Sequence, residues 1–383
     1  MKNIPFNQPF INKNAKEYVL DCLNSGVFEN GQYQQHALKH LRKLTLANHI
    51  FLTPSCTDAL EMAAALINIQ PGDEVIMPSY TFVSTANAFV LKGAVPVFVD
   101  IREDTLNIDE RLIETAITKK TKAIVAVHYA GIGCDMRAIT AIAHKHQLYV
   151  IEDAAQALNA YLDNQHLGTF GHLSTFSFHH TKNATSGLGG SLIVNDEALL
   201  DRAKCIYTKG TNRDAFLSGQ VDKYTWVDVG SSYMMCDLNA ALLTAQLESI
   251  KELTKSRLKI WKQYDTFFTN NLPESISRPF IPDNATHNAH IYYLKLSQNC
   301  HRSSIISQLN QVGVHASFHY IPLHDSPAGK KFGRSDGDLP VTQSISQTIL
   351  RLPLFVGLTT EDIMYVSHKV FDALKSESFS ISS

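Results

Sequence analysis

The sequence predicts an α/β fold in which a large, mainly parallel sheet carries helices on both faces and a smaller α+β domain follows. Short apolar segments alternate with helical stretches between about residues 50 and 200, which is the pattern of a parallel sheet. Hydrophobic residues make up 44% of the chain and charged ones 18%, below the roughly 25% that is usual. A chain of 383 residues is long enough for two or three domains, and we place a large domain at residues 1–250 and a small one at 251–383.

The predicted elements follow from apolar periodicity and turn residues. Strands are expected at residues 74–77, 95–99, 123–127, 148–152, 174–178 and 191–194. A helix is expected at 139–146, and the amphipathic stretch 238–267 indicates helices that link the two domains. In the small domain, 291–297 is predicted as a strand and 303–312 as a helix, whereas the polar tail 376–383 is expected to fray. No Gly-x-Gly-x-x-Gly follows the first strand, which argues against a dinucleotide fold.

Charge and composition narrow the function classes. The net charge is −2 and no long basic run occurs, so nucleic acid is not an expected partner. The start of the chain is polar and no apolar stretch approaches the roughly 20 residues of a membrane helix, so we expect a cytoplasmic protein without a membrane partner. The six cysteines show no paired metal spacing and are expected to be free thiols. His179 and His180 come without carboxylate or cysteine partners, so no metal site is predicted.

Lys182 is the residue that first points to a function. It lies in the run Ser-Thr-Phe-Ser-Phe-His-His-Thr-Lys-Asn at 174–183, just ahead of the glycine-rich turn 187–190. A lysine among aromatic and hydroxyl side chains is partly desolvated, which lowers its pKa and makes its amine a nucleophile toward aldehydes. Such an amine can hold a cofactor as a Schiff base, whereas an isolated lysine is usually a solvated surface charge.

A phosphate cradle is predicted at the start of a helix near residue 56. Ser55 and Asp58 have capping-box spacing, so Ser55 can be the N-cap and leave the amides of Cys56 and Thr57 free. Free amides at the positive end of a helix dipole bind phosphate, and the Thr57 hydroxyl adds a donor. An ordinary helix start would have the same pattern.

Asp153 and Gln156 follow the apolar segment 148–152 at its carboxyl end. Ligands of open α/β sheets sit at that end of the strands, and a buried carboxylate there needs a cationic partner. Asp153 opposite a pyridine nitrogen would keep the ring protonated as an electron sink, and Gln156 could reach the ring's phenolic oxygen. The alternative is that Asp153 only caps the next helix.

Phe82 lies in the loop after another predicted strand and is a candidate to stack on a flat heterocycle, unless it belongs to the core. A nucleophilic lysine, a phosphate cradle, a carboxylate and a stacking ring together are what bound pyridoxal 5′-phosphate requires. We therefore predict this cofactor.

The same segments resemble a known family, the nucleotide-sugar aminotransferases of the DegT/DnrJ/StrS type. The resemblance rests on Ser-Cys-Thr at 55–57, Thr-Phe-Val-Ser-Thr-Ala-Asn at 81–87, Glu-Asp-Ala-Ala-Gln at 152–156 and Ser-Phe-His-x-Thr-Lys-Asn at 177–183. It extends over essentially the whole chain, from Pro5 to Leu354. Three further segments, 127–131, 219–226 and 318–324, most resemble the members that form dTDP-4-amino-4,6-dideoxygalactose.

The resemblance implies a pyridoxal-phosphate enzyme of aminotransferase fold type I, with Lys182 as its catalytic residue. Asp153 would pair with the pyridine nitrogen and Gln156 with the phenolic oxygen. The other implied cofactor-binding residues are Cys56, Thr57 and Ser177 at the phosphate and Phe82 against the ring face.

The implied reaction moves an amino group from L-glutamate to a dTDP-4-keto-6-deoxyhexose, with the galactose configuration favoured, for a lipopolysaccharide or surface polysaccharide. The alternatives are the 4-amino-4,6-dideoxyglucose epimer and amination of another carbon or another nucleotide keto-sugar. A non-catalytic regulatory protein on the same fold is a further alternative, but it would be expected to lose Lys182 or Asp153.

Substrate contacts are expected from the second half of the chain. His319, Tyr320 and His324 are candidates for the sugar site, or else they pack the domain interface. Arg213 and Lys223 are candidates for the nucleotide phosphates, or else they are surface charges.

A homodimer is expected, with residues 230–235 or 209–213 reaching the neighbour's cofactor. Two departures from the family pattern affect these contacts. Leu188 stands where many relatives have glutamate. Ser232 and Met234 stand where many relatives have an asparagine and an arginine that reach across the dimer to the phosphate.

Overall fold

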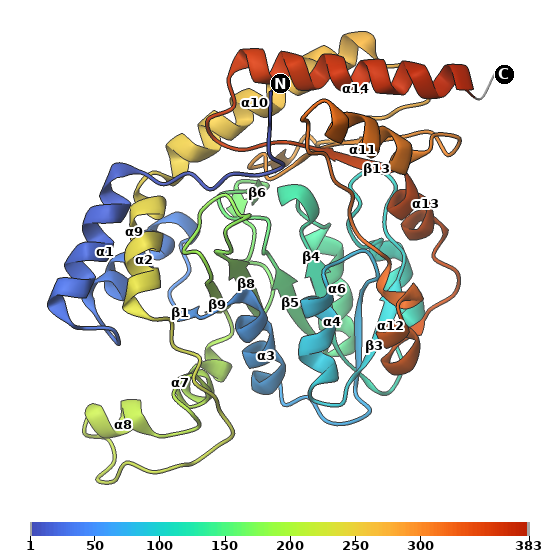
Figure 1. The fold of residues 1–383 in the computed structure, drawn as a ribbon. Helices are drawn as coiled ribbons and strands as arrows, with labels where there is room; N and C mark the ends of the chain where they lie inside the picture. The colour runs from blue at the N-terminus through green and yellow to red at the C-terminus, as the bar shows by residue number, and fades with distance from the viewer. Residues whose placement is uncertain (1, 381–383) are drawn as a thin grey trace.

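The computed structural model describes residues 2–380 and consists of a central sheet between layers of helices, with a smaller body packed at one end (Figure 1). The sheet has eight strands in the order β1-β9-β8-β5-β4-β2-β3-β12. From β8 to β12 the neighbouring strands are parallel, whereas β9 is antiparallel to both β8 and β1. The α/β class predicted from the sequence is confirmed.

The strands of the central sheet are β1 (Ile50–Thr53), β2 (Glu74–Pro78), β3 (Val95–Val99), β4 (Thr121–Val127), β5 (Tyr149–Asp153), β8 (Leu173–Ser177), β9 (Gly190–Val194) and β12 (Arg334–Ser335). Two small sheets contain β6 (Tyr161–Leu162), β7 (Gln165–His166) and β10 (Ala285–Thr286), and β11 (Tyr292–Lys295) with β13 (Ile349–Leu352). The first helices are α1 (Lys13–Ser25), α2 (Gln32–Thr45), α3 (Cys56–Leu66), α4 (Val83–Val90), α5 (Ile113–Ala116), α6 (Met136–His146) and α7 (Leu200–Tyr207). The later ones are α8 (Arg213–Leu217), α9 (Asp237–Glu248), α10 (Ile250–Asn271), α11 (Arg302–Gln311), α12 (Pro327–Phe332), α13 (Pro340–Thr348) and α14 (Thr360–Ser380).

Alternating strand residues build a core on each face of the sheet. In β2, Val75 and Met77 join the core under α3, α4 and α7, whereas Ile76 joins the core under α1, α2, α6 and α9. This is the period-two alternation of a strand that is buried on both sides. The predicted strands all occur, with ends that differ by one or two residues.

A third core belongs to the smaller body. It is formed by apolar side chains of α10, α11, α14, β11 and β13. Two segments cross the sequence boundary that we placed at residue 250, because Ile4 packs into this core and β12 returns to pair with β3 of the large sheet. The expected fraying tail is helical up to Ser380, and 381–383 lie outside the described residues.

The stretch 238–267 forms two helices, α9 and α10, which meet at Ser249. Helix α10 is the longer of the two and carries the chain from the large body into the smaller one (Figure 1). Within residues 2–380, no helix is both long and apolar enough to cross a membrane.

Candidate active site

A cavity of about 610 Å³ opens at the carboxyl ends of the parallel strands, where Val127, Asp153 and Ser177 end β4, β5 and β8. Ligands of open α/β sheets bind at this edge. The opposite wall comes from the smaller body, through β13 and residues 317–320. The cavity brings together these residues predicted from the sequence: Cys56, Thr57, Phe82, Asp153, Gln156, Ser177, Lys182, His319 and Tyr320.

Lys182 enters the cavity from the loop after β8. Its backbone N–H donates to the carbonyl of His179 at 2.9 Å, which closes a turn. Burial lowers the pKa of Lys182, whereas the nearby Cys56 and Asp153 oppose that shift. The amine is therefore neutral, and nucleophilic, at a lower pH than a lysine in water.

Asp153 is buried and fixed on both oxygens. The Thr85 hydroxyl donates to Oδ2 at 2.7 Å, and the N–H of Ala155 donates to Oδ1 at 3.2 Å. Thr85 in turn shares a hydrogen bond of 2.8 Å with Thr81. The carboxylate is thereby oriented in the cavity without a cationic partner of its own, which suits a group that meets a protonated ring nitrogen.

Gln156 joins the two walls of the cavity. Its Oε1 accepts from the N–H of Ala130 at 2.8 Å, so its Nε2 faces the opposite side and donates to the Tyr320 hydroxyl at 3.1 Å. Tyr320 stacks on His319, with ring centroids 3.9 Å apart and an angle of 12° between the planes. His319 also shares a hydrogen bond of 3.2 Å with Tyr129, which holds this aromatic wall in place.

The amino-terminal end of α3 has the predicted cap. Ser55 accepts from the N–H of Asp58 at 3.1 Å, and its hydroxyl donates to the Asp58 carboxylate at 2.7 Å. Thr57 shares a hydrogen bond of 2.8 Å with Ser84 of α4, so two helix starts meet at the cavity. Burial raises the pKa of Cys56 to about 12, which keeps it an uncharged thiol at this helix end.

Gly190 allows the helix end to approach the sheet. A Cβ atom at this position would lie 2.4 Å from the backbone nitrogen of Cys56 and 2.5 Å from the carbonyl carbon of Ser55. Real Cβ atoms do not come so close to backbone atoms. The last glycine of the 187–190 turn is therefore needed for close packing of α3 on β9.

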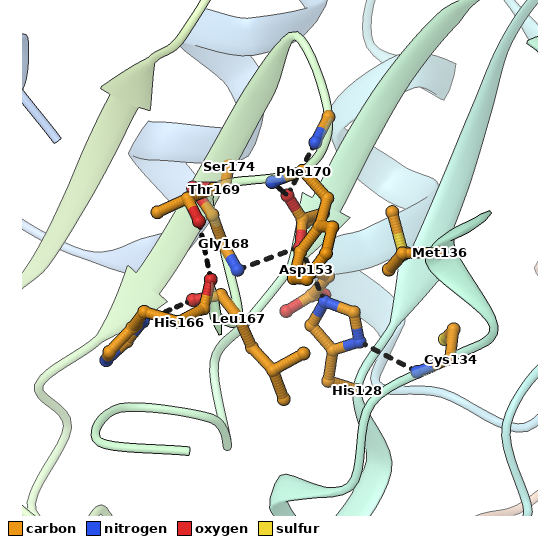
Figure 2. Close-up of polar contacts among 12 residues, drawn as sticks. His128, Cys134, Met136, Asp153, His166, Leu167, Gly168, Thr169, Phe170 and Ser174 are labelled. Atoms are coloured by element: carbon orange, nitrogen blue, oxygen red, sulfur yellow. Dashed lines mark hydrogen bonds and ion pairs between the residues drawn. The ribbon is translucent and has the colours of Figure 1, made fainter. Parts of the chain in front are cut away.

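A buried network supports the end of β5 from the side that faces away from the cavity. Glu152 accepts from the N–H groups of Gly168, Phe170 and Gly171 at 2.8, 2.7 and 2.7 Å, and its fourth partner is His128 Nε2 at 2.9 Å. His128 Nδ1 accepts from the N–H of Cys134, so the proton must be on Nε2 and His128 donates to Glu152. Figure 2 shows His128 and the loop around Gly168 next to Asp153.

Two candidates for substrate contacts lie outside the cavity. His324 is held at the junction between the bodies, where its Nδ1 pairs with the Ser79 hydroxyl at 2.7 Å. Arg213 begins α8 and forms an ion pair of 3.2 Å with Glu29. In this protomer, therefore, neither His324 nor Arg213 lines the cavity that contains Lys182.

Two departures from the family pattern are also located. Leu188 lines the cavity and is exposed there, so this part of the wall is apolar. Met234 lies next to Arg213, with 3.9 Å between its sulfur and the guanidinium.

The sequence reasoning missed several residues that line or organise the cavity. Arg351 and His290 lie in its wall, and Thr85 holds Asp153. Arg351 had a usable signal, because it is a lone charge in the apolar run 349–354. His290 and Thr85 had none that separates them from ordinary buried polar residues.

This arrangement fits pyridoxal phosphate. A lysine with a lowered pKa and an oriented carboxylate face one cavity, and the start of the 11-residue helix α3 supplies free amides for a phosphate. The volume is also within the roughly 300–1,000 Å³ of small-molecule sites.

Comparison with known proteins agrees with this geometry. The model of the DegT/DnrJ/EryC1/StrS aminotransferase family matches residues 9–371. The spore coat polysaccharide biosynthesis protein SpsC of Bacillus subtilis is 36% identical over 380 residues, which is 97% of each chain. The PLP form of the putative sugar aminotransferase Spr1654 from Streptococcus pneumoniae has a TM-score of 0.90 and 27% identity, over 98% of this chain and 100% of that one. PseC of Helicobacter pylori, an aminotransferase involved in the biosynthesis of pseudoaminic acid, has a TM-score of 0.90 and 26% identity over the same shares. The chain therefore belongs to the DegT/DnrJ/EryC1/StrS family of pyridoxal-phosphate-dependent aminotransferases.

Proposed function

We propose that the protein transfers an amino group from L-glutamate to a dTDP-4-keto-6-deoxyhexose and forms the 4-amino-4,6-dideoxy sugar in the galactose configuration. The observation that carries the proposal is the meeting of Lys182, Asp153 and Gln156 in one cavity. The description of Spr1654 as a putative sugar aminotransferase supports a sugar substrate, and the name of SpsC supports a role in polysaccharide biosynthesis. The segments 127–131, 219–226 and 318–324 support the dTDP-sugar and its configuration.

Each residue around the cofactor would have its own role in the amino transfer. The cofactor supplies an electron sink for the charge that develops when a proton leaves the carbon bearing the amine. Lys182 would take that proton from the donor's α-carbon and return it during the transfer. Asp153 and Gln156 would orient the ring, Phe82 would lie on its face, and the amides of α3 with Cys56, Thr57 and Ser177 would hold its phosphate.

The sugar would lie against the aromatic wall. His319 and Tyr320 present ring faces and polar edges to the cavity, which is the mixed surface that a hexose contacts. Burial lowers the pKa of His319 well below its ordinary value, so it would act there as a neutral hydrogen-bonding group. Leu188 gives the wall an apolar patch that suits the methyl group of a 6-deoxy sugar.

The proposal includes a homodimer in the cytoplasm. The segment around α8 extends away from the body and carries exposed apolar side chains, of which Trp226 is 76% exposed (Figure 1). Arg213 of this segment forms an ion pair with Glu29, and Phe28, which precedes Glu29 in the chain, is also exposed. Exposed apolar surface of this kind marks a protein–protein interface. A monomer mass measured by light scattering would contradict the proposed homodimer. The six cysteines are free thiols, which supports a reducing compartment.

Lys182→Ala is the decisive test of the enzyme assignment. Purified wild-type protein should be yellow, and its absorbance band should shift when L-glutamate is added. The variant should lose the covalent cofactor link, which borohydride reduction and mass spectrometry would detect. The exposed lysine of the same domain, Lys39→Ala, should behave as wild type. Turnover by the Lys182 variant would refute the assigned role.

A product analysis separates the remaining alternatives. The enzyme would be incubated with L-glutamate and a panel of nucleotide keto-sugars, and each product would be identified by NMR. An axial C4 amine supports the galactose product, and an equatorial one supports the glucose epimer. If no member of the panel is aminated, the proposed substrate class is wrong.

A further inference from the structure

His290 is a buried histidine in the wall of the cavity that contains Lys182. It is 6% exposed, and its Nδ1 pairs with Asn183 Oδ1 at 2.9 Å. Its other ring nitrogen, Nε2, has no hydrogen-bond partner in the described part of the chain, yet Nε2 is not fully enclosed by protein. Because the cavity is the space that His290 lines, Nε2 faces the cavity.

Asn183 determines which nitrogen of His290 carries the proton. The amide nitrogen of Asn183 donates to the carbonyl of Asn288 at 2.9 Å, so the amide oxygen is the atom turned toward His290. An amide oxygen only accepts, and Nδ1 of His290 is therefore the protonated nitrogen that donates. In a neutral imidazole the second nitrogen is then an acceptor, so Nε2 presents a lone pair to the cavity.

The surroundings of His290 keep its imidazole neutral. Burial lowers the pKa of His290 well below its ordinary value, and the charges of Lys182, Arg257 and Arg351 lower it further. Without a second proton, Nε2 cannot donate a hydrogen bond to a carboxylate or a phosphate. A ligand that pairs with Nε2 must therefore bring a hydrogen-bond donor.

The backbone around His290 is fixed by buried side chains. Arg257 donates to the carbonyls of Ala289 and His290 at 3.1 and 2.7 Å. Asn288 accepts from the N–H of His290 at 3.0 Å and donates to the carbonyl of Gln156 at 2.8 Å. Ala289 has a φ of 50°, in the left-handed region that residues other than glycine rarely adopt. These contacts hold a strained turn and fix the direction of the ring, as a recognition site requires.

We propose that His290 recognises the hydroxyl group next to the reacting carbonyl of the keto-sugar, an inference that rests on the proposed function. The lone pair of Nε2 would accept the hydrogen bond of that hydroxyl. Among the charged groups around His290, Lys182 has the largest effect on it, so His290 would face the substrate near the reacting carbon. In a 4-keto-6-deoxyhexose this hydroxyl is on C3, because C5 carries the ring oxygen and the methyl group.

The other ligands of the cavity fit this acceptor less well. The carboxylates of L-glutamate and the phosphates of the cofactor and the nucleotide accept hydrogen bonds, as Nε2 itself does. The remaining donor is the amine of Lys182. A contact between that amine and His290 would affect every sugar substrate equally, whereas a contact with the sugar depends on its hydroxyl.

A substrate without the C3 hydroxyl tests the inference in the wild-type enzyme with its cofactor. The enzyme would first receive the amino group from L-glutamate and then be mixed with dTDP-4-keto-6-deoxyglucose or with its 3-deoxy analogue. Absorbance would give the second-order rate constant of a single turnover. The analogue leaves Nε2 of His290 buried against the sugar and unpaired, so its rate constant should be about 5- to 150-fold lower.

Two variants of His290 assign this preference to the residue. His290→Asn keeps an amide N–H that can reach Asn183 but has no atom in place of Nε2, whereas His290→Phe keeps the ring shape and removes both nitrogens. The rate constants of the two sugars should agree within about 2-fold in either variant, because the acceptor is absent. One folded variant is sufficient, and a ratio cancels losses that affect both sugars alike.

His287→Asn is the matched control. His287 lies three residues earlier in the same segment, is half-buried and packs on Trp261 with ring centroids 4.6 Å apart. It does not line the cavity. This variant should keep the wild-type preference for the hydroxylated sugar.

The outcomes separate the inference from the proposed function. Equal rate constants for the two sugars in the wild type would refute the inference alone. Variants that slow both sugars but keep the wild-type ratio would assign His290 to the support of Lys182, and this too would overturn the inference. An enzyme that aminates neither sugar would refute the proposed function, and the inference with it.

Discussion

Glu152→Gln should destabilise the protein strongly although it changes a single atom of the side chain. The carboxylate accepts four hydrogen bonds, with His128 and Gly168 on Oε2 and Phe170 and Gly171 on Oε1. A glutamine amide offers one acceptor oxygen and one NH₂ group, so one side of this network must face a donor instead of an acceptor.

Either orientation of the amide leaves two buried N–H groups unpaired. With NH₂ at the Oε1 position, the N–H groups of Phe170 and Gly171 lose their acceptor. With NH₂ at Oε2, Gly168 loses its acceptor, and His128 can accept only by moving its proton to Nδ1, which opposes the N–H of Cys134. At about 1–3 kcal/mol for each unpaired group, the expected loss is about 2–6 kcal/mol.

Urea unfolding of wild type and variant would measure this loss as a difference in the free energy of unfolding. Glu274→Gln, which changes an exposed carboxylate, is the control and should have an effect within about 0.5 kcal/mol. A loss below about 1 kcal/mol for Glu152→Gln would refute the reasoning, because it would mean that the four contacts are not made by an ionised carboxylate.

Two further predictions concern the cofactor site. Gly190→Ala would place a Cβ 2.4 Å from the backbone nitrogen of Cys56, so we expect the end of α3 to shift. The affinity for pyridoxal phosphate, measured by absorbance titration of apoenzyme, should then fall at least about 10-fold. Ser191→Ala in the same strand is the control, and wild-type affinity in the Gly190→Ala variant would contradict the close approach. Burial lowers the pKa of Lys182 from 10.5, so the rate at which apoenzyme captures pyridoxal phosphate should rise with pH and level off below pH 10.5. The same shift of the pKa should make the apoenzyme more stable as the pH rises between the lowered pKa and 10.5. A rate that still rises through pH 10.5 would show that Lys182 is solvated.

Much of the fold was predictable from local pattern. The strand segments are short apolar runs bounded by turn residues, and they alternate with helices. This alternation implies a parallel sheet and does not depend on contacts with distant parts of the chain. Ser55 and Asp58 form the expected cap because a capping box acts within one turn of helix. The family resemblance, confirmed by the match to residues 9–371, added the aminotransferase activity to the cofactor that the residues already predicted.

The sequence by itself determined the elements and the chemistry that each delivers at its end, such as Asp153 at the end of β5 and Lys182 in the loop after β8, because these depend on neighbours along the chain. Only the tertiary structure decided which distant side chains share the cavity. It brought Arg351 into the wall and placed His324 against Ser79 and Arg213 beside Glu29. Burial and pairing arise where segments more than a hundred residues apart pack together, and no local pattern encodes that meeting.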